Sequence, residues 1–285
     1  MKWEGRRESG NVEDRRGMSG GRIAAGGGLG LVAMVVLAML FGVDPRVVLE
    51  QAGDQQVAED QTGQPYQETA EEAQRARFAR VVLADTEDTW TSIFQQSGQQ
   101  YEAPKLVLYT GSVQSACGFG QSAMGPFYCP SDRKVYLDLS FFDDMAGKLQ
   151  AGGDFGMAYV IAHEIGHHIQ TLLGVTQQVA AQRGAGEGEG ETGLSVRTEL
   201  QADCFAGVWA KKTETQKQIL EAGDLEEALN AASAVGDDRL QQRGRGYVVP
   251  ESFTHGTSAQ RARWFRKGYD TGDLEQCNTF NATTL

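Results

Sequence analysis

The chain has 285 residues, a formal net charge of −12, and 40% hydrophobic and 8% aromatic residues. This length suits one large catalytic domain with an anchor, or at most two small domains, and the hydrophobic content is sufficient for a core. The acidic balance argues against nucleic acid as a partner, because phosphate binding needs basic patches.

Residues 23–41 form an uncharged apolar run, IAAGGGLGLVAMVVLAMLF. As a helix this run spans about 28 Å, close to the roughly 30 Å hydrocarbon core of a bilayer, so we predict a transmembrane anchor. Residues 1–22 carry the basic residues Lys2, Arg6, Arg7, Arg15, Arg16 and Arg22. The positive-inside rule then predicts a cytoplasmic tail at 1–22 and a single-pass cell-membrane protein with an extracytoplasmic catalytic domain. A cleaved signal peptide is the alternative, although the basic segment is long and no A-x-A site follows Phe41.

The cysteines agree with an oxidising compartment. The chain has four of them, Cys117, Cys129, Cys204 and Cys277, and an even number outside the cytoplasm favours disulfides. Three pairings are possible. Cys117 with Cys129 would close a short Gly-rich loop, and Cys204 with Cys277 would tie the C-terminal tail to a core helix. Thiolate zinc ligands are the alternative, but the sequence has no C-x-x-C spacing.

The linker and the first part of the domain differ in apolar pattern. Residues 42–66 are rich in Gln, Gly, Asp and Glu without an apolar rhythm, which predicts a flexible linker. We expect the catalytic domain at 67–285. Apolar residues recur at helical spacing from about Gln67 to Gln96. Lys105–Thr110 and Lys134–Leu139 are typical of strands, with an irregular loop between them.

Helices are predicted for most of the remaining chain. One runs from about Asp154 to Leu173 and a second from about Ser195 to Lys212. A third opens at Asp224 with a capping-box pattern, and the last begins near Thr257 or Ser258. A helix, two strands and then mostly helices predict the α+β class.

The segment His163-Glu164-Ile165-Gly166-His167 matches H-E-x-x-H. At about 100° per residue, His163 and His167 project from one face of a helix one turn apart. Both imidazoles can then reach one zinc ion at about 2.0–2.1 Å. Glu164 lies beside them and can act as general base on the zinc-bound water, then pass the proton to the leaving amine.

The second helix supplies a third ligand. Glu199 and Asp203 are four residues apart and share a helix face, so Glu199 can complete a site of two histidines and one glutamate. Asp203 can accept a hydrogen bond from a ligand imidazole. The alternative is a solvated acidic pair. The apolar surroundings, LQADCFAGVWA, argue against that reading, because unpaired buried carboxylates are costly.

Three further residues have open roles. His168 points away from His163 on the helix and is expected to be a packed or supporting histidine. His255 can donate to the oxyanion formed during attack on a carbonyl, or can be an ordinary residue before a helix. Arg261 can bind a carboxylate and orient the site, or form a structural salt bridge.

These motifs together carry a family resemblance. HEIGHH, the later ELQAD and the late HGTSAQR resemble the putative neutral zinc metallopeptidase family of single-pass bacterial membrane proteins, over about residues 70–280. More broadly, the pattern is similar to gluzincins, which include thermolysin-like and CAAX-protease-like enzymes. The resemblance implies a zincin-like fold, with a small sheet above the active-site helix and a helical part that brings Glu199.

The resemblance also implies roles for single residues. His163, His167 and Glu199 match the zinc ligands, Glu164 matches the catalytic residue, and Asp203 matches the supporting aspartate. His255 and Arg261 match the spacing of a late His and Arg in the CAAX-protease-like group. Gly256 stands where that group has Pro. In zincins an edge strand pairs with the substrate backbone, and we expect Lys134–Leu139 to be that strand.

The sequence therefore predicts a membrane-anchored zinc peptidase that acts on a peptide or protein substrate, with Zn²⁺ as cofactor. One alternative is a zinc-binding scaffold or chaperone-like protein without turnover, which would keep zinc but not depend on Glu164. Another is an amidase of cell-wall peptides, which would use the same ligands on a different substrate. The oligomeric state does not follow from the sequence.

Overall fold

The computed structural model describes residues 1–18, 66–183 and 188–285. The chain divides into unit 1, which comprises Met1–Arg15 and Thr69–Leu285, and unit 2, Arg16–Glu68. The predicted anchor at 23–41 lies outside the described residues, as does the predicted linker at 42–66 except for Tyr66. None of the described helices has the length and apolar content needed to cross a bilayer.

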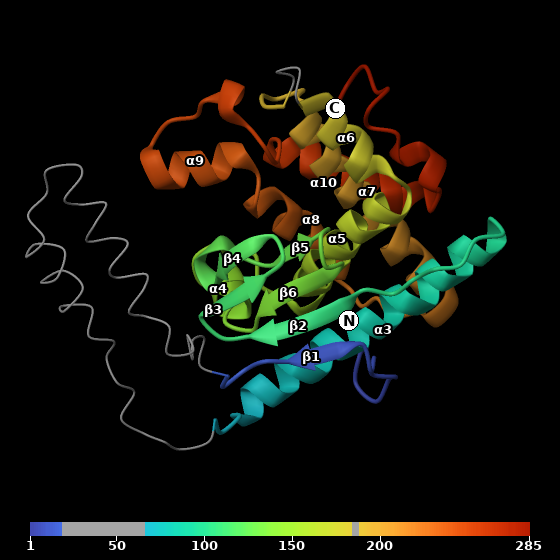
Figure 1. Ribbon diagram of the computed structural model, residues 1–285, viewed down its shortest axis with the longest axis vertical. Helices are drawn as coiled ribbons and strands as arrows, with labels where there is room; N and C mark the ends of the chain where they lie inside the picture. The colour runs from blue at the N-terminus through green and yellow to red at the C-terminus, as the bar shows by residue number, and fades with distance from the viewer. Residues whose placement is uncertain (19–65, 184–187) are drawn as a thin grey trace, which may run out of the picture. The chain divides into compact units, whose positions relative to one another are not determined.

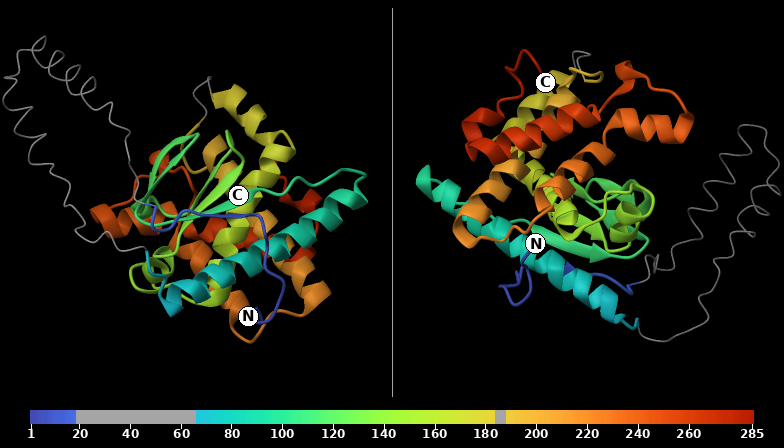
Figure 2. Two further views of the ribbon diagram at one scale, coloured as in Figure 1. Left: turned by 60° about the horizontal axis from the view of Figure 1, so that its bottom comes forward. Right: turned by 180° about the vertical axis from the view of Figure 1, so that it is seen from behind.

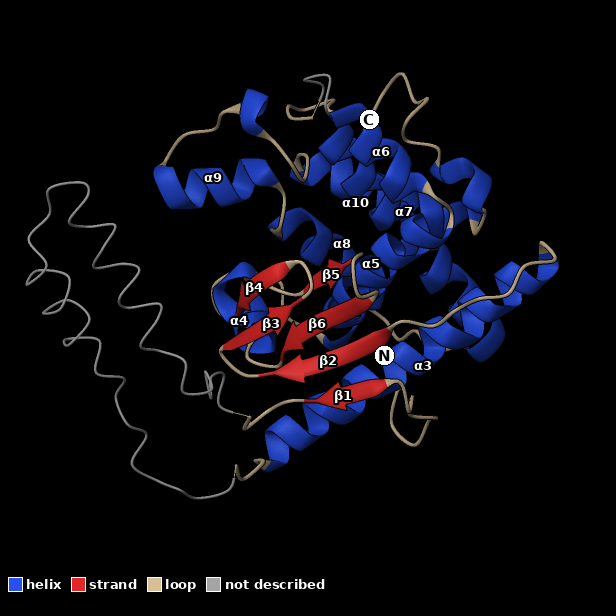
Figure 3. Ribbon diagram, in the orientation of Figure 1, coloured by secondary structure: helices blue, strands red, loops and turns tan. Residues whose placement is uncertain are grey.

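A four-stranded sheet has the order β1-β2-β6-β5 (Figure 1, Figure 3). Its strands are β1 Val12–Asp14, β2 Lys105–Tyr109, β6 Lys134–Asp138 and β5 Phe127–Cys129. The first three are parallel, and β5 runs antiparallel to β6. The two predicted strands are present as β2 and β6. The prediction that Lys134–Leu139 forms the edge is wrong, because β6 lies between β2 and β5, and β5 is the edge strand.

The predicted irregular loop between β2 and β6 contains more structure than expected. It folds as a hairpin of β3 Ser112–Ser115 and β4 Gly118–Gln121, the 3₁₀ turn η1 Ser122–Met124, and then β5. These strands are short and rich in Gly and Ser, so they lack the apolar alternation by which strands are recognised. A disulfide between Cys117 and Cys129 ties this hairpin to β5.

Helices make up most of unit 1 (Figure 2). They are α3 Ala70–Gln96, α4 Phe141–Ala146, α5 Asp154–Leu172, α6 Val175–Arg183, α7 Leu194–Lys217, α8 Asp224–Ala234, α9 Asp237–Arg245 and α10 Ser258–Thr271, with 3₁₀ turns η2 Pro250–Ser252 and η3 Leu274–Cys277. The second disulfide, Cys204–Cys277, ties α7 to η3, so both suggested pairings are present. A four-stranded sheet and a two-stranded hairpin with mainly helices are compatible with the predicted α+β class.

The core is built around α5, which packs against α7 and α8. Nearly every side chain of α5 is buried, including Phe155, Tyr159 and Ile165. A Cβ at Gly166 would lie only 3.0 Å from the Cα and carbonyl oxygen of Ala202 on α7. Glycine therefore allows α5 and α7 to approach closely at the turn that carries the H-E-x-x-H motif.

The N-terminal segment differs from the tail and domain boundary predicted at residues 22 and 67. Met1–Arg15 belongs to unit 1, and β1 extends the sheet beside β2. Trp3 is 9% exposed and packs edge-on against Phe78 of α3 at 5.5 Å. A three-residue strand between charged residues has too little apolar pattern to be recognised from sequence.

Candidate metal centre

Two neighbouring helices bring three metal-ligating side chains together. His163 and His167 project from α5 and Glu199 from α7, and one ligand atom of each lies within 4.8 Å of the others. The Nε2 atom of His163 lies 3.2 Å from Glu199 Oε2, and that of His167 lies 3.4 Å from Glu199 Oε1. The helical spacing of the motif and the close approach at Gly166 produce this cluster.

The spacing fits a tetrahedral metal ion. Zinc bonds of about 2.0–2.2 Å in tetrahedral geometry place neighbouring ligand atoms about 3.3–3.6 Å apart. The separations of 3.2 Å and 3.4 Å, each to a different oxygen of Glu199, are close to this range. Two imidazoles and one carboxylate form a donor set that leaves the fourth zinc position for water or substrate.

The electrostatics of the cluster favour a cation. Burial opposes charge on His163, but the charge of Asp203 and hydrogen bonds raise the pKa of His163 to about 9. Burial also opposes charge on His167, and Glu199 raises the pKa of His167 above its ordinary value. Burial favours the protonated form of Glu199, yet the two imidazoles hold its pKa well below the usual range. The site therefore stabilises positive charge next to Glu199, as protons on the imidazoles or as a bound metal ion.

Asp203 orients His163 from behind. The carboxylate is fully buried, and its Oδ1 accepts from His163 Nδ1 at 2.8 Å and from the Tyr159 hydroxyl at 2.5 Å. Arg261 binds the same carboxylate through Nε and Nη2, each at 2.9 Å. Because Nδ1 of His163 is engaged in this way, its Nε2 is directed toward Glu199 and is the nitrogen available to a metal ion.

A matching support for His167 was not predicted. Nδ1 of His167 lies 2.9 Å from the side-chain oxygen of Gln170. The amide nitrogen of Gln170 donates to the Thr198 carbonyl at 2.7 Å and to Gln201 Oε1 at 3.1 Å. These two donations fix the Gln170 oxygen toward the imidazole. The sequence signal was a polar residue three positions after His167 on an apolar helix.

Glu164 lies beside the ligands at the mouth of the site. Its side chain is only 8% exposed, and burial raises the pKa of its carboxyl above the ordinary value. A carboxylate with a raised pKa is suited to accept a proton near neutral pH and release it again.

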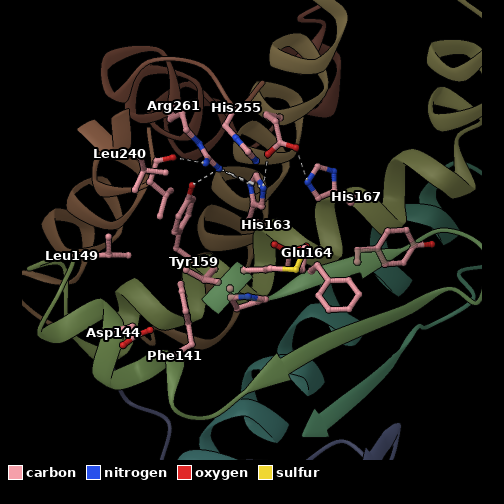
Figure 4. A pocket seen from close by; sticks show the side chains of 18 of the residues that line it. Phe141, Asp144, Leu149, Tyr159, His163, Glu164, His167, Leu240, His255 and Arg261 are labelled. Carbon is pink, nitrogen blue, oxygen red and sulfur yellow. Dashed lines mark hydrogen bonds and ion pairs between the residues drawn. The ribbon is translucent and has the colours of Figure 1, made fainter. Parts of the chain in front are cut away.

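The cluster opens into a cavity of about 580 Å³ (Figure 4). Figure 4 shows His163 and Glu164 at one end, with Leu149, Leu240 and Phe141 farther along it. Residues from η1 to β5 line another part of the wall, including Met124, Pro126, Phe127 and Tyr128. The cavity therefore joins the polar cluster to a largely apolar channel that borders the edge strand.

His255 lies in the cavity wall and is held by a residue that the sequence analysis missed. Its Nδ1 lies 3.1 Å from Asp237 Oδ1, and this hydrogen bond raises the pKa of His255. Asp237 Oδ2 also accepts from the backbone N–H groups of Thr254, His255 and Gly256 at 2.7, 2.6 and 3.1 Å. Asp237 thus fixes both the loop and the imidazole. This contact could not be predicted from the sequence, because Asp237 begins the separate helix α9, eighteen residues before His255.

His168 lies apart from the ligand cluster and has a packing role. It is fully buried. Its Nε2 lies 2.7 Å from the Glu102 carbonyl oxygen, which can only accept, so Nε2 donates. In the neutral ring Nδ1 then accepts from the Tyr128 hydroxyl at 3.1 Å. Burial lowers the pKa of His168, which keeps the ring neutral. The residue therefore links α5 to the edge strand β5.

Comparisons with known proteins agree over nearly the whole chain. A family model described as putative neutral zinc metallopeptidase matches residues 1–280. Uncharacterized protein YpfJ of Escherichia coli (strain K12) is 54% identical over 290 residues, covering 98% of this chain and 99% of the relative. Uncharacterized protein Rv2575 of Mycobacterium tuberculosis (strain ATCC 25618 / H37Rv) is 42% identical over 258 residues, covering 87% and 86%. No solved structure matches the chain.

The supports of the two imidazoles predict how metal affinity will respond to substitution. Gln170→Ala and Asp203→Asn should each lower the affinity for zinc by about 10- to 100-fold, since they release a ligand from its orientation. Competition with a chromophoric chelator measures this affinity. Gln178→Ala, at an exposed position of α6, is the control and should leave it unchanged. Wild-type affinity in the Gln170 variant would show that this hydrogen bond does not orient His167.

Proposed function

This chain belongs to the putative neutral zinc metallopeptidase family, and from that premise we propose that it is a zinc peptidase that hydrolyses peptide bonds at the His163, His167 and Glu199 cluster. The observation that carries the proposal is the convergence of one ligand atom from each of these residues to within 4.8 Å of one another, with the buried Glu164 beside them in the same cavity. The cofactor would be Zn²⁺, which suits nitrogen and oxygen ligands of this kind.

When bound, zinc supplies a Lewis acid that polarises the carbonyl and lowers the pKa of water. Glu164 then accepts the proton of the attacking water and delivers it to the leaving nitrogen. Arg261, Tyr159 and Asp203 form a buried hydrogen-bonded group that keeps His163 in one tautomer. Gln170 does the same for His167.

His255 is suited to stabilise the oxyanion of the tetrahedral intermediate. It lines the same cavity as Glu164 and Glu199, and Asp237 holds its Nδ1 so that Nε2 remains free to donate. A donor that is already oriented at the start of the reaction costs little reorganisation when charge develops on the substrate oxygen. Arg261, in contrast, is a positioning residue, because its guanidinium is engaged with Asp203.

The edge strand β5 is suited to receive an extended substrate. It borders the cavity, and its outer edge faces away from β6. Added substrate backbone would continue the sheet, with side chains alternating between the apolar wall and solvent. A small sheet whose edge strand flanks the H-E-x-x-H helix is the arrangement expected for a zincin-like fold.

Exchange of Glu164 separates the proposed enzyme from its alternatives. Glu164→Gln should keep about one zinc per chain and lose peptide hydrolysis by about 10²- to 10⁴-fold. Zinc content by atomic emission and hydrolysis of a broad peptide library are measured on the full chain, with Glu226→Gln at an exposed position as control.

Other outcomes of this experiment point elsewhere. Zinc in the wild type without hydrolysis of any peptide would favour a scaffold. Cleavage confined to cell-wall peptides would favour the amidase. A chain that binds no zinc would overturn the ligand assignment.

The role of His255 predicts an effect on turnover and on its pH dependence. His255→Ala should lower kcat by about 10²- to 10³-fold with zinc content unchanged, because one oxyanion donor is lost. The hydrogen bond to Asp237 raises the pKa of His255, so the imidazole keeps its proton to higher pH. Asp237→Asn should therefore move the alkaline limb of kcat to lower pH. If the alkaline limb did not move, the ionisation that controls kcat would not be that of His255.

Backbone pairing with β5 predicts sensitivity to N-methylated substrates. Methylation of a substrate amide that bonds to β5 removes one donor and should raise KM by about tenfold, as expected for the loss of one hydrogen bond. A series of peptides methylated at successive positions would show an alternating pattern, because only every second residue faces β5. A uniform response along the series would argue against strand addition.

A further inference from the structure

The first fifteen residues are built into the domain that carries the metal centre. β1 pairs in parallel with β2, with Val12 opposite Leu106 and Asp14 opposite Leu108. Trp3 lies in the same hydrophobic core as Phe78 and Phe155. The segment therefore supplies both sheet hydrogen bonds and buried apolar surface to unit 1.

A buried glutamate on α3 takes its hydrogen-bond partners from this segment. Glu87 is 9% exposed and bonds to Arg7 at 3.1 Å, to the Ser9 hydroxyl at 2.5 Å and to Asn11 at 2.8 Å. All three partners come from the N-terminal segment. Without it, a carboxylate would remain in this surface without its hydrogen-bond donors, which is costly. The surface of α3 around Glu87 is thus complementary in charge and hydrogen bonding to the N-terminal segment.

Arginines that suggested a cytoplasmic tail take part in the same interface. Arg6 binds the buried Asp85 at 2.5 Å, and Arg7 also binds Asp88 at 2.6 Å. Arg15 pairs with Glu13, which in turn binds Lys134 of β6 at 2.8 Å. These charges are matched within unit 1, so they have less weight as determinants of membrane orientation.

We propose that residues 1–15 lie on the same side of the membrane as the metal centre, as a permanent strand of that domain. A single crossing between Arg15 and Thr69 would separate β1 from β2 by a bilayer and break their pairing. Figures 1 and 2 show that β1 ends and α3 begins at the same end of unit 1, which agrees with both elements lying on one side. The proposal is independent of the peptidase activity.

Cross-linking in intact cells tests the docked segment. Glu8 Oε1 lies 3.2 Å from Arg77 Nε, and both side chains are exposed. The native cysteines are all paired, so Glu8→Cys with Arg77→Cys supplies the only free thiols. A short bismaleimide should join them at least about tenfold more efficiently than in Glu8→Cys with Arg266→Cys, because proximity sets the effective concentration. Arg266 is an exposed residue of α10, and Figure 1 shows α10 on the far side of the sheet from β1 and α3.

Labelling of the two single-cysteine variants with a membrane-impermeant maleimide shows on which side of the membrane each position lies. We expect Glu8→Cys and Arg77→Cys to label together, either in intact cells or only after permeabilisation. Labelling of the two positions from opposite sides would overturn the proposal. Absence of the cross-link, with both thiols reactive and zinc content unchanged, would overturn it as well.

Discussion

The close approach of α5 and α7 is the constraint on which the site depends. Glycine at position 166 lets the backbone of Ala202 approach within a distance that a Cβ would not allow. This contact places Glu199 opposite the two histidines and places Asp203 behind His163. Packing against α7 therefore requires glycine at position 166 inside the H-E-x-x-H motif. The relative positions of the ligands then follow from the helical spacing of each pair.

Burial of charge is the second constraint, and it requires a complete set of partners. Asp203 has no exposed surface, and both of its oxygens receive donors, from His163, Tyr159 and Arg261. Removing one partner would leave a buried charge uncompensated, which costs more than the pair contributes to stability. Such a group holds an imidazole in one orientation, which is the property that a metal ligand needs.

The sequence predicted those parts of the site that lie on one helix. Helix spacing alone placed His163 with His167, and the same argument paired Glu199 with Asp203. Gln170 lies three positions after His167 on the same helix and could have been found by the same spacing, whereas Asp237 reaches His255 only through tertiary packing. The long helices and the two regular strands were likewise predictable, whereas the hairpin and edge strand between them carry too few apolar residues.

The N-terminal segment shows why a charge rule and a fold can point in different directions. The positive-inside rule treats basic residues near an apolar run as free charges that resist translocation. In this structure Arg6 and Arg7 are paired with Asp85 and Glu87, two carboxylates about eighty residues away that cannot be recognised as partners from local sequence. A charge matched inside a folded domain is carried with that domain. On the proposal that residues 1–15 stay with the metal centre, orientation follows from the pairing of β1 with β2 and from the matched charges, and not from the count of basic residues.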